Sequence, residues 1–236
     1  MTVRVGFEII KNVKGIRLEV NMKTACHWII CGGSGSGKSY FILYALNSIL
    51  NDQIILYLAD FKGSGDYIGL SDKYAEFGEI TAFIEDFYSK YIEIKENQTG
   101  EHIMLIFDEY AGFLVWLEGN DKKKAAEIKN KISEILMLGR ELPGGGSAWI
   151  WIVCQRADST YFAHGARDNF MVSVGMGRLS KESKTMLFPG EDFPPQYSPE
   201  TGCGVILEDG KPLRIFEVPN FDKKRVKSLL EKKSGA

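Results

Sequence analysis

The stretch G-G-S-G-S-G-K-S, residues 32–39, decides most of what can be inferred about this chain. It fits the pattern G-x-x-x-x-G-K-[ST], in which the glycines let the backbone approach a phosphate group. An apolar run of strand character, residues 27–31, precedes it, and residues 40–50 carry Leu, Ile and Ala at helical spacing. A strand, a glycine turn and a helix together present backbone N–H groups and a helix N-terminus to an anion. The stretch therefore predicts a site for a nucleoside triphosphate.

The residue types in this motif predict separate roles. Lys38 is expected to reach the outer phosphates, and the Ser39 hydroxyl is expected to coordinate Mg²⁺. The residues expected to bind the phosphates of ATP are Gly32, Gly33, Ser34, Gly35, Ser36, Gly37, Lys38, Ser39 and Tyr40.

Composition sets the class of protein. With 236 residues the chain fits one α/β domain, and a hydrophobic content of 44% with 25% charged residues is ordinary for a soluble protein. The net charge of −2 predicts that any nucleic-acid site is a local patch. No apolar run approaches a membrane span and no signal peptide is evident, so we expect a cytoplasmic protein. The cysteines form no C-x-x-C pair, which predicts buried reduced thiols at Cys26, Cys31, Cys154 and Cys203.

The order of elements predicts an α/β fold. Residues 3–10 and 15–20 predict a β-hairpin with its turn at 11–14. Strands are expected at 27–31, 54–59, 102–107, 147–154, 170–176, 203–208 and 212–218, and helices at 38–50, 79–96, 109–117, 121–141, 180–188 and 222–233. This alternation predicts a mostly parallel sheet with helices on both faces. We expect a single domain, with the hairpin in 1–26, a nucleotide-binding core in 27–218 and a C-terminal helical segment in 219–236.

A second motif, H-I-M-L-I-F-D-E at 102–109, is an apolar strand that ends in two acids. Asp108 fits the strand-end carboxylate that holds Mg²⁺ in phosphate-loop enzymes, directly or through water. Glu109 is placed to orient or deprotonate an attacking water. Acids are also favoured at a helix N-terminus by the helix dipole. The pair therefore indicates a catalytic site only because the chain also contains a phosphate loop. Together the two motifs predict hydrolysis.

A third element is the strand S-A-W-I-W-I-V-C, which ends in Gln155 and Arg156. At the ligand-binding edge of a sheet, the Gln155 amide can sense the terminal phosphate and pass its state to Arg156 and the loop beyond. A surface glutamine at the end of a strand is the alternative interpretation.

Three motifs in this order resemble the FtsK/HerA class of DNA-pumping ATPases. They are the phosphate loop, I-M-L-I-F-D-E-Y at 103–110 and L-G-R-E-L-P-G-G-G-S-A-W-I-W-I-V-C-Q-R at 138–156. G-A-R-D-N-F at 165–170 and G-M-G-R-L-S at 175–180 are most similar to the TcpA-type branch, which is associated with conjugation. Asp60-Phe61-Lys62 resembles the D-P-K of the class, with Phe61 in place of proline.

This resemblance implies rings, usually hexamers, that thread double-stranded DNA through a central pore. It also implies that an arginine from a neighbouring subunit stabilises the transition state of hydrolysis. Arg178 and Arg140 are the candidates, each with the alternative of an ordinary surface arginine.

Two segments are candidate contacts to DNA. Lys122, Lys123 and Lys124 form a basic run, although interleaved glutamates also fit a solvated helix face. The other segment follows Gln155 and resembles the pore loops of the class, with cations at Arg156, His164 and Arg167.

These patterns predict an ATP-hydrolysing translocase of double-stranded DNA from a mobile genetic element. It is expected to act alone or with a relaxase or a membrane-anchored conjugation partner, because neither a membrane-spanning region nor a winged-helix tail is present in the sequence. Two alternatives stay open, a viral genome-packaging ATPase and a nucleotide-dependent adaptor that moves no DNA.

Overall fold

The chain builds two structural units whose segments interleave along the sequence. The computed structural model describes residues 1–10, 13–49, 53–195 and 197–234. The first unit comprises residues 1–52, 155–157 and 171–236, and the second comprises residues 53–154 and 158–170. The phosphate loop belongs to the first unit, and the acidic strand end belongs to the second.

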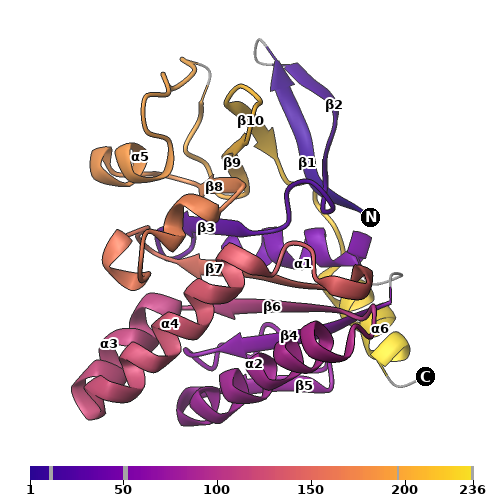
Figure 1. Ribbon diagram of the computed structural model, residues 1–236. Coiled ribbons are helices and arrows are strands. Elements are labelled where there is room, and N and C mark those ends of the chain that lie inside the picture. Colours follow the sequence, from indigo (N-terminus) through magenta and orange to yellow (C-terminus); the bar gives the residue numbers. More distant parts are fainter. Residues whose placement is uncertain (11–12, 50–52, 196, 235–236) are drawn as a thin grey trace. The chain divides into compact units, whose positions relative to one another are not determined.

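The first unit is built on a sheet in which the strands follow the order β2-β1-β10-β9-β8-β3. Its strands are β1 (Thr2–Ile10), β2 (Val13–Asn21), β3 (Trp28–Gly32), β8 (Val172–Met176), β9 (Cys203–Glu208) and β10 (Arg214–Glu217). β3 and β8 run parallel, whereas the N-terminal and C-terminal strands pair antiparallel. Figure 1 shows the hairpin of β1 and β2 beside β10 and β9.

Three helices complete this unit: α1 (Lys38–Ile49), α5 (Lys181–Leu187) and α6 (Lys223–Ser234). Phe41 of α1 is fully buried and lies between Trp28 of β3 and Phe216 of β10, at ring-centroid distances of 6.4 and 5.4 Å. Aromatic rings at these separations add to the area that they bury. This cluster therefore holds the helix that follows the phosphate loop firmly against the sheet.

The second unit is built on a fully parallel sheet with strands in the order β7-β6-β4-β5. The strands are β4 (Ile54–Asp60), β5 (Lys73–Glu76), β6 (His102–Asp108) and β7 (Ser147–Cys154), and the helices are α2 (Ile80–Asn97), α3 (Tyr110–Asn120) and α4 (Lys122–Leu138). α3 and α4 lie side by side (Figure 1). Every residue of β7 is buried, as an apolar run in a parallel sheet requires.

The predicted α/β class with an N-terminal hairpin and C-terminal strands is confirmed, and most predicted elements begin and end within a few residues of those observed. The sequence pattern predicts no strand at β5. It is an edge strand of four residues in which only Ala75 is buried, so it lacks the apolar alternation that identifies strands. Short 3₁₀ turns lie at Phe77–Glu79, Pro143–Gly145, Ser159–Tyr161 and Ala166–Asn169.

The predicted hairpin turn at 11–14 is too long. Val13 and Lys14 already belong to β2, where they pair with Ile10 and Ile9. Residues 11 and 12 lie outside the described residues. Val and Lys carry no turn signal of their own, and pairing with β1 satisfies their backbone groups. Among the described residues, no helix is long and apolar enough to cross a lipid bilayer.

Candidate functional site

The phosphate loop runs from the end of β3 at Gly32 to the start of α1 at Lys38. Gly35 and Gly37 have φ angles of 75° and 96°, in the left-handed region that favours glycine. The Lys38 ammonium donates hydrogen bonds to the carbonyl oxygens of Gly32 and Gly33, at 2.8 and 3.1 Å. The lysine thus braces the loop, and its ammonium group lies against the loop backbone.

Close packing explains two of the glycines. A Cβ at Gly32 would lie 2.6 Å from the carbonyl oxygen of Met176. A Cβ at Gly37 would lie 3.1 Å from the backbone nitrogen of Gly202. The Thr201 hydroxyl donates to the carbonyl of Gly35, and Gly202 N–H donates to the carbonyl of Ser36, both at 3.3 Å. The turn before β9 therefore supports the loop from behind.

The remaining predicted phosphate ligands are also located in this unit. Gly33 and Ser34 are exposed, Ser39 is partly exposed, and Ser36 is buried with no hydrogen-bond partner for its Oγ among the described residues. Tyr40 is held differently, because its hydroxyl donates to the Pro219 carbonyl and accepts from the N–H of Phe221.

In the second unit, the acidic residues at the ends of β4 and β6 are neighbours. Asp60 and Asp108 pair in the parallel register, and both are almost fully buried. Ser64 donates its N–H and its hydroxyl to Oδ2 of Asp60, each at 2.8 Å. The Tyr67 hydroxyl donates to Oδ2 of Asp108 at 2.9 Å. These hydrogen bonds partly offset the cost of taking the two carboxyl groups out of water.

Glu109 follows in a strained conformation. Its φ and ψ of 59° and 37° are left-handed, which is uncommon for a residue with a side chain. The Asp108 carboxylate accepts the N–H of Glu109 at 2.9 Å and so holds this turn. Strained backbone in such a place is typical of functional residues, because the surrounding structure must maintain it.

Magnesium is implied by the phosphate loop, and each unit by itself offers one hard oxygen donor of the kind that Mg²⁺ prefers, the Ser39 hydroxyl in the first and the Asp108 carboxylate in the second. Both oxygens of Asp108 already accept hydrogen bonds, which suits a carboxylate that holds the ion through its water shell. Among the described residues there is no cluster of three acidic, histidine or cysteine ligands.

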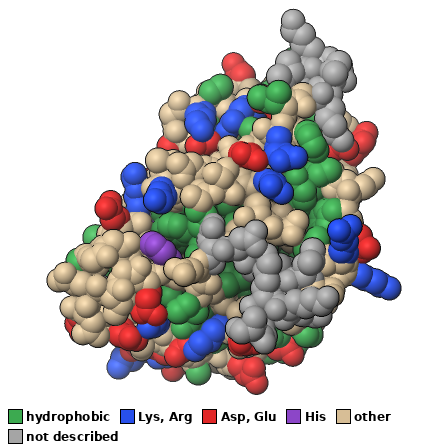
Figure 2. All heavy atoms as spheres, turned by 90° about the vertical axis from the view of Figure 1, so that its right-hand side faces the viewer, with side chains coloured by type: hydrophobic (Ala, Val, Ile, Leu, Met, Phe, Trp, Pro, Cys, Tyr) green, Lys and Arg blue, Asp and Glu red, His purple; other side chains and the backbone are tan. Residues whose placement is uncertain are grey.

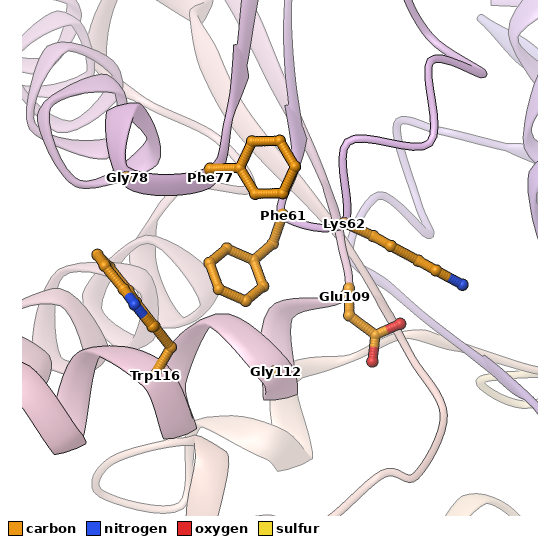
Figure 3. A pocket seen from close by; sticks show the side chains of 7 residues that line it. All are labelled: Phe61, Lys62, Phe77, Gly78, Glu109, Gly112 and Trp116. Carbon is orange, nitrogen blue, oxygen red and sulfur yellow. The ribbon is translucent and has the colours of Figure 1, made fainter.

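An apolar pocket of about 450 Å³ lies beside Glu109, and the sequence analysis did not anticipate it. Figure 3 shows the ring of Phe61 between Phe77 and Trp116, and the side chains of Lys62 and Glu109 extending to one side. Phe77 and Trp116 are 52% and 40% exposed, far more than is usual for apolar residues of their size. The signal that identifies this pocket is Phe61 in the position where the resembling class has proline.

Phe77 carries strain of its own. Its φ of 48° is left-handed, and a Cβ at Gly63 would lie 2.5 Å from its ring. The aromatic side chain is therefore held at the mouth of the pocket by a backbone that glycine would adopt more readily.

The polar residues predicted around the nucleotide lie at different places. Gln155 is exposed directly after β7. Arg140 is exposed after α4 in the second unit. Arg178 is exposed in the first unit and follows Gly177, where a Cβ would lie 2.9 Å from that of Ser36. Arg178 is thus adjacent in sequence to a residue that packs against the phosphate loop of its own chain.

The basic run on α4 is partly neutralised. Lys124 contacts Glu85 and Glu127 at 3.0 and 3.3 Å, and the hydrogen bond to Glu85 raises its pKa above the ordinary value. Lys122 and Lys123 are exposed. Lysine and arginine side chains are interspersed with acidic ones on the face shown in Figure 2, in keeping with the near-neutral net charge.

The cationic side chains of the second candidate DNA-binding segment, which follows Gln155, also lie in different environments. Arg156 pairs with Glu182 at 2.5 Å, although both side chains are more than half exposed, so the pair is weak. His164 is exposed with a left-handed φ of 54°, and Arg167 is half-buried in the 3₁₀ turn that follows. Tyr110 is fully buried and donates its hydroxyl to the Tyr161 carbonyl, which ties this segment to α3.

Three features define the fold of a phosphate-loop ATPase. They are glycines required by close packing, a lysine bonded to the loop that precedes it, and a buried acid at a strand end. No family model matches the chain. The FtsK domain-containing protein YdcQ of Bacillus subtilis (strain 168) is 26% identical over 198 residues. The match covers 75% of this chain and 40% of YdcQ. The chain is a homologue of this FtsK-domain protein and spans less than half of its length.

Solved structures agree on the fold. The pCW3 conjugation coupling protein TcpA, in a monomer form with ATPγS, has a TM-score of 0.71 and 18% identity, covering 98% of this chain and 70% of its own. The cytoplasmic domain of the type VII secretion ATPase EccC of Thermomonospora curvata has a TM-score of 0.71 and 16% identity, covering 100% and 31%. The genome packaging NTPase B204 of Sulfolobus turreted icosahedral virus 2, in complex with AMPPCP, has a TM-score of 0.55 and 15% identity. This match covers 85% of this chain and 100% of B204. The chain thus has an FtsK-like ATPase fold.

The strain at Glu109 predicts a gain in stability on its removal. The left-handed conformation costs an L-residue about 1–2 kcal/mol and costs glycine much less, so Glu109→Gly should raise the free energy of unfolding by about 1 kcal/mol. Urea denaturation measures the change. Glu109→Ala is the matched control, because it removes the carboxylate but keeps the Cβ. A glycine variant less stable than the alanine variant would contradict the strain.

Proposed function

We propose that this chain is the motor domain of an ATP-hydrolysing translocase of double-stranded DNA. The observation that carries the proposal is the phosphate loop, in which Gly32 and Gly37 are closely packed and Lys38 is bonded back to the Gly32 carbonyl. Such a loop presents backbone N–H groups and one ammonium group to a polyphosphate.

The residues would divide the chemistry of hydrolysis. The loop amides and Lys38 bind and orient the phosphates, and Ser39 and Asp108 would hold Mg²⁺. That ion supplies neutralisation of charge on the phosphate oxygens when bound. Glu109 orients and deprotonates the attacking water, and its left-handed backbone directs the carboxylate. Gln155 senses the terminal phosphate.

DNA is the proposed substrate because of the relatives. The homologous protein carries an FtsK domain, and the TcpA structure with the same fold is that of a conjugation coupling protein. We infer action in the cytoplasm on the DNA of a mobile element, as a homo-hexamer that works with a relaxase or a membrane-anchored partner. Exposed Lys122, Lys123 and His164, with half-buried Arg167, would contact phosphates without reading sequence.

Two other functions have support from specific observations. The packaging NTPase B204 matches over its entire length, which favours a role in genome packaging with the same engine. EccC is a type VII secretion ATPase, and one EccC structure is a complex with a signal sequence peptide. The exposed pocket of Phe61, Phe77 and Trp116 favours an apolar peptide as an alternative ligand, which would make the chain a peptide-regulated ATPase.

Two substitutions separate nucleotide binding from turnover. Lys38→Ala should abolish tight binding, because it removes the charge on the loop. Glu109→Gln should keep binding but lower turnover by about 10²–10⁴-fold, the usual contribution of a general base. Binding of a non-hydrolysable ATP analogue and steady-state phosphate release are the two measurements. Glu96→Gln, an exposed substitution on α2, is the matched control. Full turnover in Glu109→Gln would disprove the assignment.

The substrate is tested by ATP hydrolysis with and without long double-stranded DNA at two salt concentrations. Phosphate contacts release counterions, so DNA should stimulate turnover and the stimulation should fall as salt rises. An apolar peptide in a parallel reaction tests the secretion-type alternative. Turnover that responds to the peptide and is indifferent to DNA would refute the translocase proposal.

The origin of the catalytic arginine is tested by mixing two inactive variants. We expect Arg178 to act on the site of a neighbouring subunit, so equimolar Lys38→Ala and Arg178→Ala should together recover part of the wild-type turnover. The recovered sites combine an intact loop from one subunit with Arg178 of the other. A mixture of Lys38→Ala with Glu109→Gln is the control and should stay inactive. Failure of the first mixture would indicate that Arg178 serves its own loop.

A further inference from the structure

Charge is distributed unequally between the two units. The segments of the first unit carry 18 lysines and arginines against 12 aspartates and glutamates, a net charge of +6. Those of the second unit carry 11 against 19, a net charge of −8. The near-neutral charge of the whole chain therefore combines a basic unit with an acidic one. A polyanion is attracted to the first unit by its overall field, whereas its contacts on the second unit have to be local.

Part of this positive charge is gathered where β1 and β2 meet α1. Arg4 of β1 pairs with Glu19 of β2, and Arg17 lies two residues before Glu19 on the same strand. The backbone N–H of Arg4 donates to Oγ of Ser48 on α1 at 2.9 Å. Burial raises the pKa of the Tyr44 hydroxyl, one turn before Ser48, and the charges of Arg17 and Arg4 oppose this rise. Both guanidinium groups thus lie close to α1.

The start of α6 brings further cations to the same helix. Phe221 packs on Tyr40 and Tyr44 of α1, at ring-centroid distances of 4.3 and 5.8 Å. The Nζ atom of Lys223 lies 5.4 Å from the centre of the Tyr40 ring. α1 therefore contacts both β1 and α6 (Figure 1). The exposed cations on the two sides of this helix form one basic patch, which comprises Arg4, Arg17, Lys223, Lys224 and Arg225.

The two carboxylates among these residues are already engaged. Glu19 lies 3.9 Å from Arg4 and 4.0 Å from Arg17, and all three side chains are about half exposed, so both ion pairs are weak. Asp222 accepts the backbone N–H groups of Lys224 and Arg225 and thereby caps α6, where the helix dipole offsets its charge. The cations of the basic patch therefore outnumber the carboxylates and stay available to an external anion.

The apolar residues around the basic patch favour nucleic acid over a lipid surface. No large apolar side chain is exposed among the described side chains of α1 and α6. Ile16 of β2 is exposed, but it is adjacent to Arg17 in a strand and so points to the opposite face of the sheet. Surfaces that bind membranes add apolar residues to their cations, whereas contacts to phosphodiesters need only the cations.

We propose that the basic patch binds the phosphodiester backbone of nucleic acid, outside the segments that resemble pore loops. The inference rests on the proposed action on DNA and deepens it, because it assigns a contact surface to the first unit. Arg4 and Arg17 on the hairpin and the three cations of α6 contact phosphate oxygens without reading the base sequence. None of these five residues belongs to the basic run or the loop that the sequence patterns single out.

The test is equilibrium binding of a fluorescently labelled DNA duplex of random sequence, without nucleotide, over a series of salt concentrations. Lys224→Gln with Arg225→Gln removes two cations from the α6 side of the patch. Arg4→Gln with Arg17→Gln removes two from the hairpin side. Each pair should weaken binding about tenfold or more and reduce the slope of log K against log salt by about 2, because fewer counterions are released.

The matched control is Lys181→Gln with Lys211→Gln, which removes two exposed lysines of the same unit outside the basic patch. Its net charge equals that of each patch variant, so it should keep the wild-type slope. Circular dichroism checks that all three variants keep the fold. Loss of affinity in both patch variants, but not in the control, supports the assignment.

The remaining outcomes separate this inference from the proposed function. A wild-type chain that binds no duplex would refute the action on DNA itself. If the wild-type chain binds and both patch variants match the control, the basic patch is not the contact surface, although the chain binds DNA elsewhere. Binding to vesicles of phosphatidylcholine and phosphatidylserine that both patch variants lose, with duplex binding unchanged, would assign the patch to a membrane instead.

Discussion

The closeness of the backbone around the phosphate loop is the constraint on which this structure depends. Gly32 has no room for a Cβ beside Met176, and Gly37 packs closely, though less tightly, against Gly202. Backbone N–H groups bind a phosphate only where no side chain prevents its approach, so the loop and the segments behind it must fit together without Cβ atoms. The aromatic cluster at Phe41 then fixes the following helix, and the turn before β9 supports the loop.

A few hydrogen bonds likewise hold the acidic strand ends of the second unit. Asp108 uses its carboxylate to hold the backbone of Glu109 in a conformation that the chain would otherwise avoid. A hydroxyl from Tyr67 stabilises the same carboxylate from the other side. The buried charge thus serves a structural purpose as well as its proposed chemical one. Glu109 and Phe77 both have a strained backbone, and both line the same pocket. The pocket thus joins the proposed catalytic acid to an exposed aromatic surface.

The main elements were predictable because their signals are local. Apolar runs and glycine turns identified β3, β6, β7 and the helices that follow, and two short motifs singled out Lys38 and Glu109. β5 was missed because a short edge strand with one buried residue has no periodic pattern. The hairpin turn was overextended because strand pairing, and not turn propensity, decides where Val13 lies. The neutralisation of Lys124 by Glu85 could not be foreseen, since these residues are distant in sequence.

The sequence by itself predicted the class of ligand, because the glycines, the lysine and the strand-end acids carry their chemistry in residue type and spacing. It also determined the order of strands and helices, through the periodicity of apolar residues. Only the tertiary structure decided which residues surround that chemistry. The aromatic pocket of Phe61, Phe77 and Trp116 draws on three separate segments, and the basic patch combines residues from near both ends of the chain. Pockets and patches of this kind form from side chains that meet only after folding, so no local pattern records them.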